Sequence, residues 1–155
     1  MKGNQQLIDT MNSLLADELT AISQYMVHAG ICANWGYGKL DKTIEKRAID
    51  EMKHAEKLIG RVIFLEGKPV VNNLREMHIM NEVPKMFDSD HGLEAGAIVA
   101  YNAAIKVAGD VADFATREML ESILQDEDRH IDGIEEVQDE ISQMGPQVFL
   151  STQLD

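Results

Sequence analysis

The stretch Ile49-Asp50-Glu51-Met52-Lys53-His54-Ala55 places a glutamate and a histidine three positions apart, and Asp126-Glu127-Asp128-Arg129-His130-Ile131-Asp132 repeats the arrangement 76 residues later. Residues three apart share one face of an α-helix, so each Glu and its His can bind one metal ion from a single turn. The same shift superposes Glu18 on Glu94 and Tyr25 on Tyr101. Each half therefore reads as a helix with one Glu followed by a helix with Asp-Glu-x-[Lys/Arg]-His. This internal repeat predicts two helical hairpins related by a pseudo-two-fold axis.

Four long amphipathic segments carry these motifs. Their apolar residues recur with a period close to 3.6, and strand patterning is limited to Pro69-Val70-Val71. The breaks are rich in Gly, Pro and Asn and fall at 34–38, 67–69, 109–110 and 145–146. The connection from about Gly67 to Glu82 is longer than antiparallel neighbours need, which indicates a crossover. The sequence thus predicts an all-α four-helix bundle with one long crossover and a short fifth helix within residues 147–154.

Composition limits the classes of function. The chain has 155 residues, 45% of them hydrophobic, and 27 Asp and Glu against 14 Lys and Arg, for a formal net charge of −13. One globular domain over residues 1–155 is expected, and the charge argues against nucleic acid and anionic membranes as partners. Cys32 is the single cysteine, so neither an internal disulfide nor a Cys-rich zinc site is expected. No apolar run approaches the ~18 residues of a membrane span, and a cytoplasmic location is the default expectation.

Four glutamates fall within the apolar stripes of the four helices, one in each. Four carboxylates in one core would repel one another and lose hydration unless protons or cations compensate them. Oxygen and imidazole donors suit iron or manganese, and one Glu from each of two helices plus Glu-x-x-His from each of the other two is the di-iron or di-manganese carboxylate pattern. Charged residues that fall on inner faces by chance are the less favoured interpretation. The predicted ligands are Glu18, Glu51, His54, Glu94, Glu127 and His130, with Glu51 and Glu127 bridging.

The chain resembles the bacterioferritins essentially from end to end. The similar segments are Met1-Lys2-Gly3, Glu18 to Tyr25, Asn34-Trp35-Gly36, Ile49 to Ala55, Phe64-Leu65-Glu66-Gly67 and Asp126 to Asp132. The resemblance implies a ferritin-like fold and a homo-oligomeric shell of 24 subunits built from haem-bridged dimers. It also implies a ferroxidase, which oxidises Fe(II) with O2 or H2O2 at a di-iron centre within each subunit and stores the ferric mineral inside the shell.

Helix geometry and the resemblance predict different roles for Met52. It is rotated by about 100° from Glu51 on the helix, away from the metal face, where packing is the usual role of a methionine. The resemblance instead implies an axial ligand of a b-type haem, one haem per subunit pair, used in iron release with a ferredoxin or reductase as partner. Tyr25 is expected to pack in the core, with a hydrogen bond near the site or electron donation as the alternatives. Lys46 stands where several bacterioferritins carry a histidine, which argues against an extra iron site on the inner surface.

Three other interpretations fit the sequence less well. A rubrerythrin-type peroxidase needs Cys-x-x-Cys pairs, which a chain with one cysteine lacks. The net charge of −13 argues against a mini-ferritin that binds DNA. The pairing of Glu and Glu-x-x-His ligands within one chain argues against a mini-ferritin that binds its irons between subunits. A plain structural bundle would bind no iron stoichiometrically.

Overall fold

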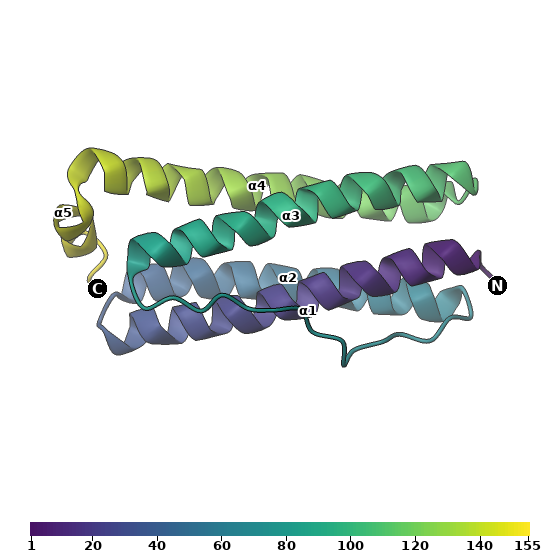
Figure 1. Cartoon of the computed structure of the whole chain (residues 1–155), viewed down its shortest axis with the longest axis horizontal. Helices are drawn as coiled ribbons and strands as arrows, with labels where there is room; N and C mark the ends of the chain where they lie inside the picture. The colour runs from purple at the N-terminus through teal and green to yellow at the C-terminus, as the bar shows by residue number, and fades with distance from the viewer.

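The computed structural model describes residues 1–155 and contains five helices and no strand. The predicted fold class, with four long helices and a short fifth, is confirmed. Figure 1 shows α1 and α2 as one hairpin, α3 and α4 as the other, and the two chain ends at opposite ends of the bundle. No helix is long and apolar enough to cross a membrane. The helices are α1 (Gln5–Asn34), α2 (Gly38–Phe64), α3 (Val83–Asp110), α4 (Phe114–Met144) and α5 (Pro146–Ser151).

The helix ends follow from local sequence. The Asn4 side chain caps α1 by accepting a hydrogen bond from the amide of Leu7 (3.1 Å), and Asp113 caps α4 in the same way. Gly36 and Gly145 have φ values of +85° and +82°, a region that residues with a Cβ avoid. The turns after α1 and α4 therefore fall where the glycines of the sequence predict them.

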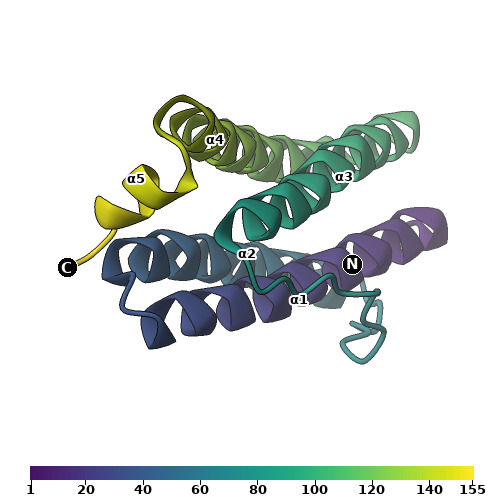
Figure 2. The same cartoon turned by 60° about the vertical axis from the view of Figure 1, so that its left-hand side comes forward.

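The long connection between α2 and α3 runs along the bundle rather than across its end (Figures 1 and 2). We call its residues 68–80 the crossover strap. Within α1, Asn12 donates to the carbonyl of Lys68 (3.0 Å) and accepts from the amide of Val70 (2.9 Å). Farther along, Thr20 accepts a hydrogen bond from the backbone amide of Arg75 (2.8 Å). These bonds replace the strand or helix partners that an extended segment lacks.

Two further α1 side chains hold the end of the strap. Gln24 Oε1 accepts from the amide of His78 (3.0 Å), and His28 Nε2 accepts from the amide of Met80 (3.0 Å). With Asn12 and Thr20 they form a row at multiples of four residues, and such rows are inclined to the helix axis. The strap therefore crosses α1 obliquely.

Asp90 of α3 binds two of the side chains that hold the strap. It accepts hydrogen bonds from Gln24 Nε2 and His28 Nδ1, both at 2.9 Å, and lies 3.5 Å from Arg47. Because His28 Nε2 accepts from the backbone of Met80, its proton is on Nδ1 and the ring is neutral. Arg47 and Asp90 are thus the two charges of a buried, compensated cluster.

Replacing Gln24 should loosen the strap. Gln24→Leu removes the acceptor of the His78 amide and a donor to Asp90. The His78 amide and the Asp90 carboxylate then each lose a hydrogen bond in a buried or partly buried place. We expect a loss of about 1–3 kcal/mol of stability in chemical denaturation. Hydrogen exchange of the 75–80 segment should become faster. Exposed Gln125→Leu is the matched control, and equal exchange in the two variants would contradict the role of the row.

Candidate metal centre

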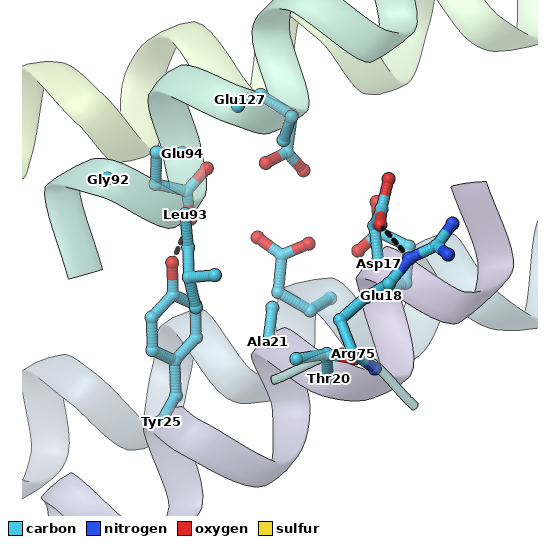
Figure 3. Close-up of a pocket in the computed structure, with 13 residues that line it drawn as sticks. Asp17, Glu18, Thr20, Ala21, Tyr25, Arg75, Gly92, Leu93, Glu94 and Glu127 are labelled. Atoms are coloured by element: carbon cyan, nitrogen blue, oxygen red, sulfur yellow. Dashed lines mark hydrogen bonds and ion pairs between the residues drawn. The ribbon is translucent and has the colours of Figure 1, made fainter. Parts of the chain in front are cut away.

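The four glutamates of the repeat lie at the middle of the bundle. Two apolar clusters fill its ends, one around Leu7, Leu58 and Leu120 and the other around Tyr25, Ile44 and Phe87. Between them the carboxylates of Glu18, Glu51, Glu94 and Glu127 point toward one another and are at most 3% exposed. Figure 3 shows Glu18, Glu94 and Glu127 converging from three different helices.

The predicted ligands form two overlapping groups. Glu18, Glu51, His54 and Glu127 offer one ligand atom each within 4.8 Å of one another, and Glu51, Glu94, Glu127 and His130 do the same. Glu51 and Glu127 belong to both groups, as expected of carboxylates that bridge two ions. Glu18 and His54 belong to one group alone, and Glu94 and His130 to the other.

Each histidine turns Nδ1 into the cluster and is oriented through Nε2. His54 Nδ1 lies 2.9 Å from Glu127 Oε1, and its Nε2 lies 2.8 Å from Asp126 Oδ2. His130 Nδ1 lies 2.8 Å from Glu51 Oε1, and its Nε2 lies 3.0 Å from Asp50 Oδ2. The two aspartates are the residues before Glu127 and Glu51, so each Asp-Glu pair holds the histidine of the other hairpin. A carboxylate on the far ring nitrogen fixes the tautomer that leaves Nδ1 free for a metal.

Five buried polar atoms of this cluster lack a hydrogen bond of normal geometry, although Glu127 Oε1 and Glu51 Oε1 keep the close contacts with His54 Nδ1 and His130 Nδ1 given above. Folded proteins rarely leave such atoms unpaired, because each loses its hydration without compensation. All five belong to predicted ligands, and oxygens and an imidazole nitrogen suit iron or manganese. The residues therefore fit a pair of metal ions. The atoms are Glu18 Oε2, Glu51 Oε1, Glu94 Oε2, Glu127 Oε1 and His130 Nδ1.

Two tyrosines link the hairpins beside this cluster. The Tyr25 hydroxyl donates to Glu94 Oε1 and the Tyr101 hydroxyl to Glu18 Oε1, each at 2.5 Å. Burial, followed by the charge of the bonded glutamate, raises both tyrosine pKa values well above the usual value. Both hydroxyls therefore remain donors, and each is bonded to one oxygen of a predicted ligand. Tyr25 is fully buried in an apolar cluster, as expected, and its hydroxyl also makes the hydrogen bond near the site that is one of the alternatives.

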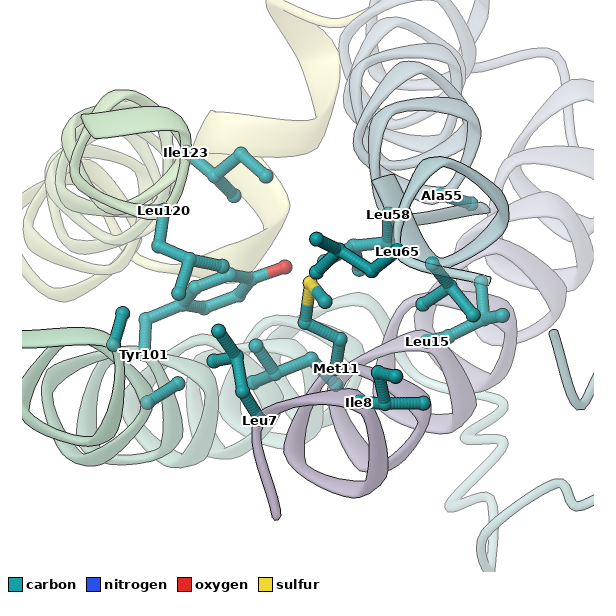
Figure 4. Packing of buried hydrophobic residues seen from close by; sticks show 14 residues of the cluster. Leu7, Ile8, Met11, Leu15, Ala55, Leu58, Leu65, Tyr101, Leu120 and Ile123 are labelled. Carbon is teal, nitrogen blue, oxygen red and sulfur yellow. The ribbon is translucent and has the colours of Figure 1, made fainter. Parts of the chain in front are cut away.

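The surroundings of the tyrosines differ. Tyr101 packs within the apolar cluster that includes Leu7, Met11 and Leu120 (Figure 4). The Arg47 guanidinium lies 5.1 Å from the centre of the Tyr25 ring, with Asp90 beyond it. The pseudo-symmetry of the ligands therefore does not extend to the next layer of side chains.

Without a metal, the cluster holds protons. Burial and then hydrogen bonding to Glu94 raise the pKa of Glu127 to about 9, whereas burial and the charge of Glu18 raise the pKa of Glu51. Burial disfavours the charged form of His54, but hydrogen bonds to Glu127 and Glu18 raise its pKa to about 10. Burial also opposes ionisation of Glu94, yet hydrogen bonds from Glu127 and His130 lower its pKa to about 2. Protons shared among these groups thus replace part of the charge that metal ions would bring.

The other residues singled out in the sequence lie away from the centre. Met52 is 45% exposed on α2, and Ile49, three residues before it, is 41% exposed. Lys46 is exposed and lines a surface pocket that also contains Asp50, Arg129 and His130. Cys32 is buried, and burial raises the pKa of its thiol to about 11, so it is unreactive at neutral pH.

The sequence patterns did not identify the buried polar residues Gln24, His28, Arg47 and Asp90. Each is a polar residue in an otherwise apolar stripe, which is a signal that a helical pattern can show. Their partners lie on different helices and on the strap, so no spacing along the chain predicts those contacts.

Comparison with known proteins places this arrangement in a class. The family model described as a ferritin-like domain matches residues 8–144, so the chain belongs to the ferritin-like proteins. Within that class it belongs to the bacterioferritin family. It is 36% identical over 149 residues to bacterioferritin from Rhodobacter capsulatus, which covers 96% of this chain and 92% of the relative, and 36% identical over 152 residues to bacterioferritin from Streptomyces coelicolor, which covers 98% and 91%.

The fold agrees with this assignment. The solved structure of R. capsulatus bacterioferritin superposes with a TM-score of 0.98 and 34% sequence identity, covering 100% of this chain and 97% of that chain. That structure has a metal-free dinuclear site and its haem iron in a crystallographic special position.

Metal binding should release protons. At pH 7 the raised pKa values keep Glu127 and His54 protonated, but a metal needs both groups without those protons. We expect at least two protons to leave as a pair of Co(II) ions binds, and the affinity should increase with pH towards those pKa values. Calorimetry in buffers of different ionisation enthalpy measures the release. A pH-independent affinity would show that the cluster is already deprotonated.

Proposed function

We propose that the protein is an iron-storage ferroxidase. Two Fe(II) ions are its substrate and bind to Glu18, Glu51, His54, Glu94, Glu127 and His130. The observation that carries the proposal is the set of five buried atoms without a hydrogen bond of normal geometry, all on these six residues. Membership of the bacterioferritin family supports iron as the metal, and the net charge of −13 favours the collection of cations.

The reaction balances with either proposed oxidant. Hydrogen peroxide takes one electron from each Fe(II) and, with two protons, is reduced to two water molecules while its O–O bond breaks. Dioxygen takes the same two electrons and, with two protons, is reduced to hydrogen peroxide. Two electrons are required at once, which explains the use of two ions held side by side.

The chain's own residues position and compensate the ions. Glu51 and Glu127 hold the pair together because each belongs to both ligand groups. His54 and His130 supply neutral donors whose orientation Asp126 and Asp50 fix. Tyr25 and Tyr101 hold one oxygen each of Glu94 and Glu18, so these carboxylates offer the other oxygen to the metal. The ligands are thus set in place before the metal binds, which reduces the rearrangement that oxidation requires.

The proposal extends to haem and to assembly. Met52 exposes its thioether on α2, beside the exposed Ile49, so an apolar surface is free to receive a flat group shared with a second subunit. Met52 and the partner subunit's Met52 would hold the iron of a b-type haem, one per subunit pair. Such a haem supplies electron transfer for the reduction and release of stored iron. The dimers would assemble into a shell of 24 subunits, with a ferredoxin or reductase as the electron donor.

Iron binding tests the centre directly. Anaerobic titration should saturate near two Fe(II) per chain, followed by rapid oxidation when O2 or H2O2 is added. Loss of a residue that hydrogen-bonds to a metal ligand weakens metal binding by about 10–100-fold. Glu127→Gln changes a ligand itself and removes its charge, so it should lower the affinity for Fe(II) by at least that much. The metal-free variant should remain folded, because the raised pKa keeps Glu127 protonated at pH 7 and glutamine replaces this neutral carboxyl with a neutral group of the same size.

Exposed Glu118→Gln on the same helix is the matched control and should behave as the parent protein. If Glu127→Gln binds and oxidises iron at the parent rate, the proposed centre is wrong.

Haem binding is tested separately. The parent supplemented with haem should show a Soret band and a haem content near one per two chains. Met52→Leu should lose the spectrum of thioether ligation. Met144→Leu is the control, because Met144 is 44% exposed and so matches Met52 in accessibility. Identical spectra for the two variants would remove Met52 as the ligand without affecting the di-iron proposal.

A further inference from the structure

A cavity of about 190 Å³ joins the metal centre to the surface between α1 and α3. Its inner wall is made by Glu18, Glu51, Glu94 and Glu127, and Arg75 of the crossover strap lies at its opposite side with Asp17 (Figure 3). We call its outer opening the portal, defined by Asp17, Thr20, Arg75, Gly92 and Gly96. The portal is distinct from the side of the centre on which Asp50 and Asp126 hold the histidines.

Two glycines keep the α3 edge of the portal open. Gly92 and Gly96 lie four residues apart on one side of α3, and a Cβ at either position would meet no atom within 4 Å. Neither has a positive φ, so backbone conformation does not require glycine there. Glycine in the middle of a helix lowers stability relative to alanine, and here it leaves space above the cavity.

The opposite edge is fixed in position. Arg75 donates from Nε to Asp17 Oδ1 (2.9 Å) and from its terminal nitrogen to Ser13 Oγ (2.8 Å). Its backbone amide donates to Thr20, as part of the row that attaches the strap. The portal therefore carries a cation held in place, with its nearest carboxylate already paired.

Beyond this edge the walls offer no free ligand before the glutamates. The Thr20 hydroxyl donates to the carbonyl of Ala16 (2.8 Å) and accepts from Arg75, and the Tyr25 hydroxyl donates to Glu94. The other lining side chains are apolar, namely Ala21, Leu93 and Ala97. A hydrated divalent cation would lose water here without replacement, which is costly. A small neutral molecule has no such penalty.

We infer that the portal is the entrance for the oxidant, a small neutral molecule of the size of dioxygen or hydrogen peroxide, and that Gly92 and Gly96 set the largest oxidant admitted. The inference rests on the proposed ferroxidase function and deepens it. Metal ions reach the centre by another path, since the portal presents a fixed guanidinium and no intermediate ligand.

Gly96→Leu tests the inference, with Gly96→Ala as a milder variant. Both substitutions replace a helical glycine with a good helix former in open space, so the fold should persist. Gly60→Leu on α2 is the matched control, because a Cβ at Gly60 also meets nothing within 4 Å and Gly60 does not line this cavity. Size-exclusion chromatography checks that all three variants assemble as the parent does.

Two rates are compared by stopped flow. In Gly96→Leu, oxidation of preloaded Fe(II) by H2O2 should slow by about tenfold or more, and Gly96→Ala should fall between this variant and the parent. Anaerobic Co(II) binding should stay within about twofold of the parent, a change of less than about 0.5 kcal/mol in barrier. In the parent, tert-butyl hydroperoxide should oxidise far more slowly than H2O2. Gly60→Leu should match the parent in every assay.

Each other outcome overturns the inference. If Gly96→Leu slows Co(II) binding as much as oxidation, the portal is the path of the metal. If neither rate changes, the portal is not used.

Nitric oxide separates this inference from the proposed function. It is small and neutral and binds Fe(II) without turnover, so its binding rate should also fall in Gly96→Leu. If the parent binds two Fe(II) but never oxidises them, the ferroxidase proposal fails, and the nitric oxide rates alone still decide the portal. If the parent binds no metal, the Co(II) titration shows this first and both proposals are wrong.

Discussion

The rest of the structure depends on four carboxylates brought together in the dry centre of a bundle. An uncompensated buried carboxylate costs several kcal/mol, so the four glutamates are tolerated only because protons, tyrosine hydroxyls, histidines or metal ions share their charge. The apolar core is divided into two clusters on either side of this layer. One glutamate from each helix, and histidines held by the aspartates of the other hairpin, close this polar layer from four sides.

The sequence predicted this layer well because it is encoded by short-range spacing. Glu51 with His54 and Glu127 with His130 are separated by less than one turn, and the 76-residue repeat sets the two halves in register. The end of α1 and the start of α5 were also predictable from local sequence, because Gly36 and Gly145 lie at these positions. The contacts of Asp90 could not be predicted in this way. They join α3 to α1 and α2 across long sequence separations, and only the fold brings those elements together.

The two hairpins are alike in their ligands and unlike in what supports them. The 76-residue shift carries Gln24, His28 and Arg47 onto Ala100, Ala104 and Ile123, so a buried polar cluster in one half corresponds to apolar packing in the other. The difference coincides with the strap, which is attached mainly along α1 and reaches the second hairpin through the hydrogen bond from the Ser89 hydroxyl to the carbonyl of His78 (2.7 Å). The ligand residues are thus related by pseudo-symmetry, whereas the side chains around them are not. The side of the ligand cluster next to Gly92 and Gly96 remains accessible.

The oblique row of acceptors on α1 also sets the course of the strap. Rows at four-residue and three-residue spacing are inclined in opposite directions on a helix. From Asn12 the three-residue row passes through Leu15, Glu18 and Ala21, all of which face the interior, whereas the row that holds the strap passes through Thr20 and Gln24. The strap therefore follows the four-residue row, and its direction along α1 is set by the order of these side chains.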